Sequence, residues 1–147
     1  MSMVKMKLDS ASLMGDFFDS TQIIGILSHL KDYQLCWHIN HALNFDFRVN
    51  NDLEIYWMKN RKRIGFTVFE YSEPVKSVGH YLYNNHFQAE FLLPELKNID
   101  YLWMIKGNYY GQEEVKSLVE QLRQVPEVQL VSVLTMEEIK HKENLIF

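Results

Sequence analysis

The stretch from Leu53 to Leu92 most constrains the fold, because its apolar side chains recur at every second position. Three groups of residues carry this alternation: Leu53, Ile55 and Trp57; Ile64, Phe66 and Val68; and Phe87, Ala89 and Phe91. Successive side chains of a strand point to opposite faces of a sheet, so the alternation indicates strands with one buried face. Residues 59–63 and the pair Asn84-Asn85 are the expected turns, since Asn tolerates a positive φ. The stretch is predicted to form an antiparallel meander of about four short strands.

The C-terminal third is predicted to fold as strand, helix and strand. Residues 101–105 are continuously apolar, which is typical of a central strand covered on both faces. Between Gly111 and Pro126 a helical stripe follows, formed by Val115, Leu118, Val119 and Leu122. Residues 128–134 complete the unit, and if its two strands are parallel their crossover should be right-handed.

The N-terminal part is predicted to contain an opening strand at residues 5–8 and a helix at residues 32–43. In that helix Leu35, Ile39, Ala42 and Leu43 form one apolar face, and Asp32 is its expected cap. Periodicity does not decide between helix and strand for residues 22–30. The fold class predicted from these elements is α+β, with a largely antiparallel sheet and helices packed mainly on one face.

Composition indicates one folded domain spanning residues 1–147. The 147 residues are 47% hydrophobic and 14% aromatic, enough to bury roughly two thirds of the unfolded surface. The net charge of −4 argues against a protein wrapped in nucleic acid, but it leaves room for a local basic patch. We find no apolar segment of signal-peptide length and none approaching the roughly 20 residues of a membrane span. We therefore expect a cytoplasmic protein without a membrane partner.

Residues 93–101 contain Pro94, Glu95, Asp100 and Tyr101 in the pattern Leu-Pro-Glu-Leu-Lys-Asn-Ile-Asp-Tyr. This segment resembles the one after which the bacterial IPExxxVDY family is named, with Leu and Ile replacing the family's first Ile and its Val. Patches similar to the family also occur at residues 28–33, 60–61 and 142–147, so the resemblance spans nearly the whole chain. The family is of uncharacterised function, and the resemblance implies no activity.

The residues of this segment favour a structural role. Pro94 suits the end of a strand that leaves a sheet, because it cannot donate a backbone hydrogen bond. Asp100 is a good turn residue just before an apolar strand. In the alternative interpretation, Glu95 and Asp100 form an acidic pair that binds a cation or a basic group, or works as acid and base.

Two further patterns are weak signals for chemistry, and from them we predict no catalytic residue, metal or cofactor. His38 and His41 could share a metal at i and i+3, but Cys36 points about 160° away from His38 around the helix axis. A single cysteine excludes an internal disulfide. No nucleophile elbow, phosphate-binding glycine loop or HExxH pair is present. Residues 107–111 could bind an anion in front of a helix. A metal-dependent or acid–base enzyme is accordingly our third hypothesis.

A basic cluster at the first turn supports the second hypothesis, an RNA-associated accessory domain. The cluster consists of Lys59, Arg61, Lys62 and Arg63. Such a loop can contact phosphates, and nearby aromatic rings could stack on bases if they faced outward; these are Tyr56, Trp57, Tyr81 and Tyr83. The alternative is a solvated turn that keeps the hairpin soluble.

The chain ends in three large apolar residues, Leu145, Ile146 and Phe147, and a terminus of this kind should be docked. The tail could pack on its own domain, exchange in a homodimer, or enter a groove on another protein. Burial of the three side chains could contribute several kcal/mol. Our leading hypothesis is a non-catalytic binding module that contacts an unidentified protein partner, or a second copy of itself, through this tail.

Overall fold

The computed structural model describes residues 15–53, 55–59 and 61–147, with only the backbone described for Trp57 and Lys59. The strand expected at residues 5–8 lies outside the described residues. The main sheet is six-stranded, in the order β10-β1-β9-β6-β5-β2, and neighbouring strands are antiparallel. Its strands are β1 (Thr21–Ser28), β2 (Arg48–Val49), β5 (Val68–Glu73), β6 (Val78–Asn84), β9 (Tyr101–Lys106) and β10 (Val128–Leu134).

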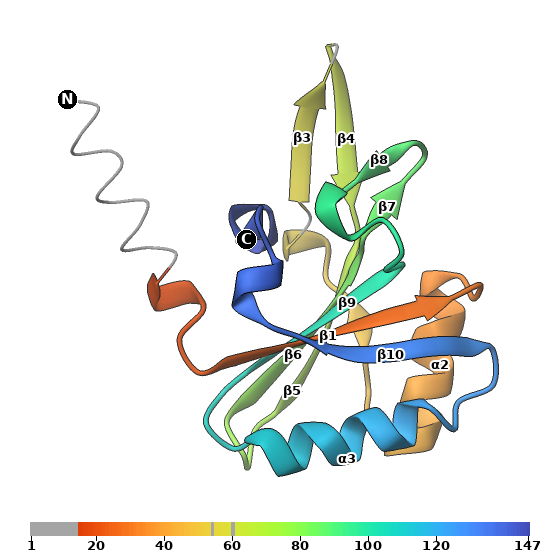
Figure 1. Cartoon of the computed structure of the whole chain (residues 1–147), viewed down its shortest axis with the longest axis vertical. Coiled ribbons are helices and arrows are strands. Elements are labelled where there is room, and N and C mark those ends of the chain that lie inside the picture. Colours follow the sequence, from red (N-terminus) through yellow and green to blue (C-terminus); the bar gives the residue numbers. More distant parts are fainter. Residues whose placement is uncertain (1–14, 54, 60) are drawn as a thin grey trace.

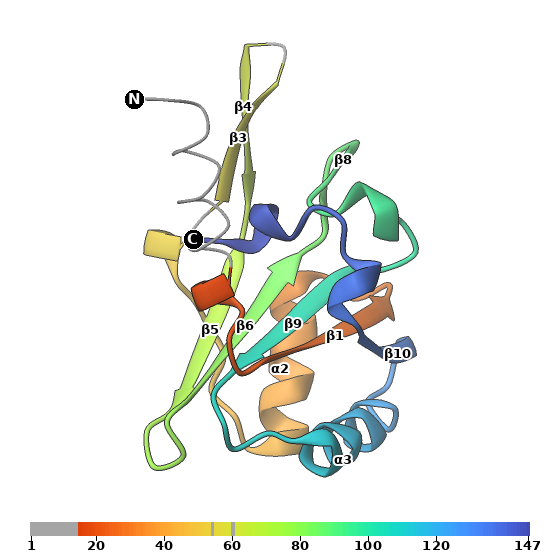
Figure 2. The same cartoon turned by 60° about the vertical axis from the view of Figure 1, so that its left-hand side comes forward.

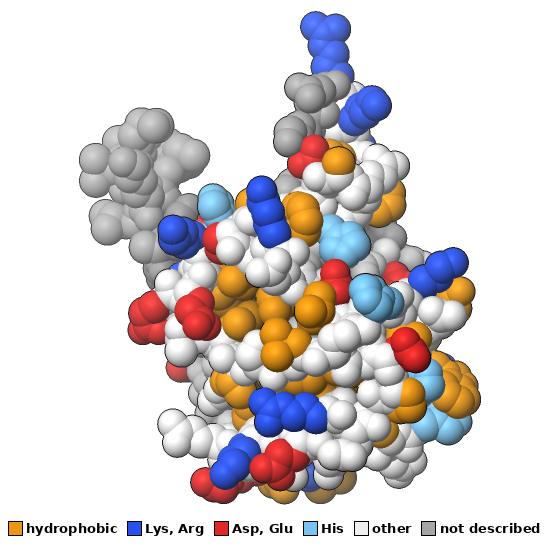
Figure 3. Space-filling model, turned by 45° about the vertical axis from the view of Figure 1, so that its right-hand side comes forward, with side chains coloured by type: hydrophobic (Ala, Val, Ile, Leu, Met, Phe, Trp, Pro, Cys, Tyr) orange, Lys and Arg blue, Asp and Glu red, His pale blue; other side chains and the backbone are white. Residues whose placement is uncertain are grey.

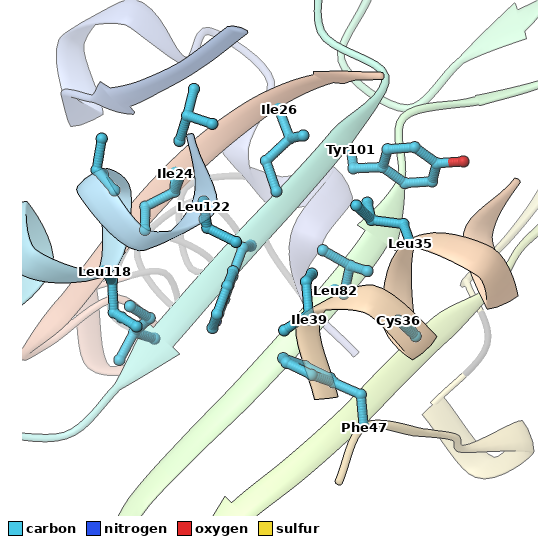
Figure 4. Close-up of a cluster of buried hydrophobic side chains, with 14 of the residues drawn as sticks. Ile24, Ile26, Leu35, Cys36, Ile39, Phe47, Leu82, Tyr101, Leu118 and Leu122 are labelled. Carbon is cyan, nitrogen blue, oxygen red and sulfur yellow. The ribbon is translucent and has the colours of Figure 1, made fainter. Parts of the chain in front are cut away.

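The helices α2 (Asp32–Leu43) and α3 (Gln112–Leu122) lie against the same face of this sheet (Figures 1 and 2). The fold is therefore α+β, as predicted from the sequence. A close-up of the core shows how the two helices direct apolar side chains toward the strands (Figure 4). The labelled contributors include Leu35, Ile39, Leu118 and Leu122 from the helices and Ile24, Ile26 and Leu82 from the sheet. None of the helices in the described part of the chain is long and apolar enough to cross a membrane.

A second hydrophobic core covers the opposite face. It includes Phe66, Tyr83, Leu93, Leu102, Met104 and Leu145. These residues come from the sheet, from a hairpin of β3 (Ile55–Lys59) and β4 (Lys62–Phe66), and from the chain around a small pair, β7 (His86–Phe87) and β8 (Glu90–Phe91). Short 3-10 turns lie at Asn51–Leu53, Pro94–Leu96, Met136–Glu138 and Lys142–Leu145. The β3–β4 hairpin projects away from the body (Figures 1 and 2).

Most of the elements expected from the sequence are present. The helix at residues 32–43 is confirmed, and the undecided segment forms β1. The C-terminal strand, helix and strand are confirmed as β9, α3 and β10, and residues 101–105 are buried. Because β1 lies between β9 and β10 and is antiparallel to both, these two strands run parallel. Lys31, rather than Asp32, is the N-cap of α2, and its amide donates to the side chain of Gln34.

The prediction of a hairpin at Asn84-Asn85 was wrong. β6 ends at Asn84, and β7 pairs with β8 instead of turning back on β6. The reason is the buried amide of Asn85, which donates to the carbonyls of Leu96 and Ile99 and accepts from the amide of Leu93. These bonds hold the chain against the segment preceding β9. The turn expected at residues 59–63 does form, between β3 and β4.

Candidate functional site

The segment 93–101 holds the loop that leads from β1 into α2. The Oδ2 atom of Asp100 accepts a hydrogen bond from the amide of Ser28 at 2.9 Å. The next residue, Tyr101, donates its hydroxyl to the carbonyl of Leu30. Burial, followed by the charges of Asp32 and Asp100, raises the pKa of Tyr101, so its hydroxyl keeps the proton that it donates. Asp100 and Tyr101 thus fix where α2 begins.

Glu95 holds a different segment, the chain just before the C-terminal tail. Its Oε2 accepts hydrogen bonds from the amides of Lys140 at 2.6 Å and His141 at 2.8 Å, and its Oε1 lies 2.9 Å from His141 Nδ1. Partial burial raises the pKa of Glu95, but these hydrogen bonds outweigh burial and the pKa is lowered overall. Pro94 opens the short 3-10 turn that presents this carboxylate.

The two carboxylates of the segment therefore serve separate backbone segments. Asp100 binds the β1–α2 loop and also lies 3.1 Å from His86 Nε2, while Glu95 binds residues 140–141. The described residues contain no group of three or more His, Cys, Asp or Glu side chains that could hold a metal ion. In each carboxylate one oxygen accepts from backbone amides of another segment and the other lies beside a histidine nitrogen, so the contacts act as a clasp.

The tail packs on its own chain. Leu145 is fully buried, and its carbonyl accepts the hydroxyl of Tyr83 at 2.8 Å. The ring of Phe147 packs on the rings of Phe17 and Tyr81, with centroids 5.2 and 4.9 Å apart. Ile146 is half-buried. Of the three residues that we expected to contact a partner, only Phe147 leaves a large part of its side chain exposed.

The outer side of α2 carries a row of exposed aromatic side chains. Tyr33 and Trp37 lie one turn apart and are 58% and 56% exposed. The ring of His41 lies on the indole of Trp37, with centroids 3.9 Å apart. We call Tyr33, Trp37 and His41 the aromatic strip. Beside it lies a hollow of about 250 Å³ lined by Tyr33, Gln34, Trp37 and His38.

Among the described residues, the pair His38 and His41 has no third His, Cys, Asp or Glu side chain with which to hold a metal ion. Nδ1 of His41 lies 3.0 Å from the carbonyl oxygen of Trp37, which can only accept, so this nitrogen carries the proton. Cys36 is buried on the inner side of the helix, and burial raises the pKa of its thiol. These residues contribute to packing and to the aromatic strip.

The described part of the basic hairpin presents exposed charge beside partly covered aromatic rings. Arg61, at φ 64°, and Lys62 are exposed near its end. The guanidinium of Arg63 covers the ring of Tyr56 at 3.6 Å. Tyr83 is fully buried and Tyr81 packs on Phe147, so neither offers the stacking surface expected for RNA. The side chain of Trp57 lies outside the described residues, and the hypothesis of an RNA-associated domain stays a prediction.

Sequence reasoning missed a buried polar cluster under α3. His80 is fully buried; its Nδ1 accepts the indole N–H of Trp103, and its Nε2, 3.4 Å from Glu73, makes no hydrogen bond with any described residue. Glu73 accepts the hydroxyl of Tyr110 at 3.2 Å. A shallow cavity of about 240 Å³ borders Glu73 and Tyr110. The only signal was a histidine in an alternating strand, which does not reveal the face to which it points.

Residues 107–111, which the sequence left open as an alternative anion site, already direct one amide at a carboxylate of the chain. Oε1 of Glu114 accepts the amide of Gly111 at 3.1 Å. Tyr110 is buried against Glu73, and the ammonium of Lys76 lies 4.4 Å from the ring centroid of Tyr109. An anion would have to displace Glu114 and approach Glu73, which works against binding.

Comparison of the chain with protein-family models, with curated proteins and with solved structures found no match. The resemblance to the IPExxxVDY family therefore stays a prediction, and the function is argued from the geometry.

Proposed function

We propose that this protein is a non-catalytic binding module that docks a protein partner on the aromatic strip of α2. One observation carries the proposal: Tyr33 and Trp37 lie one turn apart on a single helix, and each is more than half exposed. Large aromatic side chains are the residues that most often dominate the energy of protein interfaces. Leaving two of them side by side in water is costly unless a partner covers them.

The strip is held rigidly from beneath. On its inner side, α2 buries Leu35 and Ile39 completely against the sheet. Its beginning is fixed by the contacts of Asp100 and Tyr101 with the β1–α2 loop. A partner therefore meets a preorganised surface, and little conformational entropy is lost when the two bind.

The charges around the strip indicate the chemistry of the partner. Lys31 is the N-cap of α2, two residues before Tyr33, and the rings of His38 and His41 contact the indole of Trp37. The carboxylate of Asp32, in the first turn of α2, is already an acceptor for the amide of Tyr33 and the side-chain amide of Asn84. The surface thus fits a peptide segment with a large apolar side chain, which fills the hollow beside Trp37, next to one or more carboxylates.

Burial of Leu145 is the reason for placing the contact on α2 rather than on the tail. A side chain that is fully buried in its own chain can reach a partner only if the tail unfolds from the domain. Tyr33 and Trp37 need no such rearrangement.

Selection from a displayed random-peptide library on the intact protein tests the proposal. We expect selected peptides to combine a large apolar residue with Asp or Glu. The substitution Trp37→Ala should weaken their binding about tenfold or more, the usual effect of removing a dominant interface residue. Tyr109→Ala, which removes another half-exposed ring, should leave binding unchanged. Basic peptides, or binding that survives Trp37→Ala, would refute the proposal. Circular dichroism must show that both variants fold.

A further inference from the structure

The two edges of the main sheet differ sharply. One edge, β2, has only two residues, and its Arg48 forms an ion pair with Asp46 at 3.0 Å. The other edge, β10, has seven residues, Val128–Leu134, and none of them is charged. Short, charged edge strands protect a sheet from pairing with other chains, whereas long uncharged ones invite it. Only the β2 edge carries such protection in its own side chains.

The backbone of β10 is oriented for pairing. The carbonyl of Ile26 in β1 accepts the amide of Asp100 at 2.8 Å, so the polar backbone groups of Ile26 face β9. Ile26 is the partner of Val131 in the β1–β10 register. In an antiparallel pair, when the backbone N–H and C=O of one residue point away from the partner strand, those of the residue opposite it also point away. The N–H and C=O groups of Val131 therefore point to the free edge, as do those of Val133, two residues on.

The side chains along this edge are also incompletely covered. Leu130 and Val133 are 49% and 47% exposed. Val133 lies on the same face as Val131, which belongs to the core under the helices. Leu130 lies on the same face as Leu134, which packs against the other core. Leu130 and Val133 therefore lie on opposite faces of the sheet. A groove of about 540 Å³ runs between β10 and α3 beside Val133. Figure 3, which brings this side forward, shows hydrophobic side chains gathered across the middle of the face.

We infer that β10 pairs with β10 of a second copy of this chain, antiparallel and around a two-fold axis at Ser132. In this register Leu130 faces Leu134 of the second copy and Val133 faces its Val131, so each half-exposed apolar side chain meets an apolar neighbour. An axis at Val131 would place Leu130 opposite Ser132 and Val133 opposite Gln129. Since β10 carries no charge, neither register brings like charges together.

A dimer of this kind forms an isologous interface and continues the six-stranded sheet of one copy into that of the other. It does not depend on the aromatic strip, because Tyr33 and Trp37 belong to α2 and take no part in β10 pairing. The dimer would carry two aromatic strips, and a partner with two binding segments could then bind both.

Sedimentation equilibrium over a range of concentrations tests the pairing. We expect the full chain to dimerise, and Val133→Lys to weaken the dimer about tenfold or more, because it places a charge opposite Val131 of the second copy. Val75→Lys is the matched control, since Val75 is almost completely exposed in the β5–β6 turn. A protein that stays monomeric up to high micromolar concentration, or a dimer unaffected by Val133→Lys, would overturn the inference.

A cysteine at the axis tests the register. Ser132 would lie opposite its own copy in a non-hydrogen-bonded pair, where Cα atoms are about 4.5 Å apart, within the range that a disulfide spans. Ser132→Cys should therefore give a covalent dimer on mild oxidation. Gln129→Cys should not, because it faces Thr135 of the second copy. The native Cys36 is buried. Oxidation of the unmodified chain measures any cross-linking through this residue. Cross-linking through position 129 but not 132 would overturn the proposed axis.

Discussion

The indole of Trp103 donates a hydrogen bond to Nδ1 of His80, with 3.0 Å between the two nitrogens, and both side chains are fully buried. An indole N–H can only donate, so Nδ1 of His80 is unprotonated. A neutral His80 then carries its proton on Nε2, on the side of Glu73. The bond selects one tautomer of a histidine in the core beneath α3.

This pair predicts that the protein loses stability in mild acid. Burial lowers the pKa of His80 to about 4, although Glu73 opposes the shift; Lys76 lowers it slightly further. Below pH ~6.5 the unfolded chain binds a proton at this site that the folded chain does not. The free energy of unfolding should therefore fall between pH 6.5 and 4, by up to about 3 kcal/mol from this residue.

Urea unfolding at several pH values between 7.5 and 4 measures this effect. His80→Gln is the control, since glutamine keeps a hydrogen-bond acceptor but does not titrate. The variant should be less stable at pH 7.5 and should lose less stability on acidification than the native chain. Equal losses in the two proteins would mean that His80 is not the group responsible.

Removing the carboxylate of Asp100 should loosen the start of α2. In Asp100→Ala the amide of Ser28 loses its acceptor, and a lost hydrogen bond of this kind costs about 1–3 kcal/mol. Asp100→Asn keeps one acceptor oxygen and should cost less. Hydrogen exchange of the amides of residues 28–35 should become faster in the alanine variant. Unchanged stability and exchange would show that Asp100 does not act as a clasp, and would favour the acid–base interpretation.

The sequence predicted those elements whose burial follows a simple period. The helix at residues 32–43 and the strand at residues 101–105 could be located because each has a regular apolar pattern. The hairpin at Asn84-Asn85 was wrong because Asn85 uses its side chain to bind segments eleven and fourteen residues away. Turn propensity describes only the neighbouring residues, so it cannot detect such a contact.

The candidate site could not be predicted from the sequence, for a different reason. Tyr33 and Trp37 look like ordinary helix residues, and only the packing of α2 shows that they point away from the core. The free edge of β10 depends on strand order, which places β1 between β9 and β10. Residues 94–101 were recognisable as a motif, but their role in holding the β1–α2 loop and residues 140–141 depends on contacts across the chain.

The tail should behave as part of the core. Leu145→Ala removes a fully buried side chain and should cost about 2–5 kcal/mol of unfolding free energy, whereas Phe147→Ala should cost clearly less because that ring is partly exposed. Chemical denaturation measures both. Peptides selected on the native chain should still bind the folded fraction of each variant. If Leu145→Ala left stability unchanged but abolished peptide binding, the tail rather than α2 would be the contact surface.

Arg123 should oppose the pairing of β10. Its guanidinium donates to the carbonyl of Val131 at 3.3 Å, and that carbonyl faces the free edge, where a second β10 would bind it. The arginine must therefore move away before the strands pair. Arg123→Ala should tighten the dimer, by about two- to tenfold for a net hydrogen-bond energy of ~0.5–1.5 kcal/mol. Sedimentation equilibrium measures the change, with Arg48→Ala at the opposite edge as the control. A weaker dimer in Arg123→Ala would show that the arginine contributes to the interface, and would contradict competition for the carbonyl of Val131.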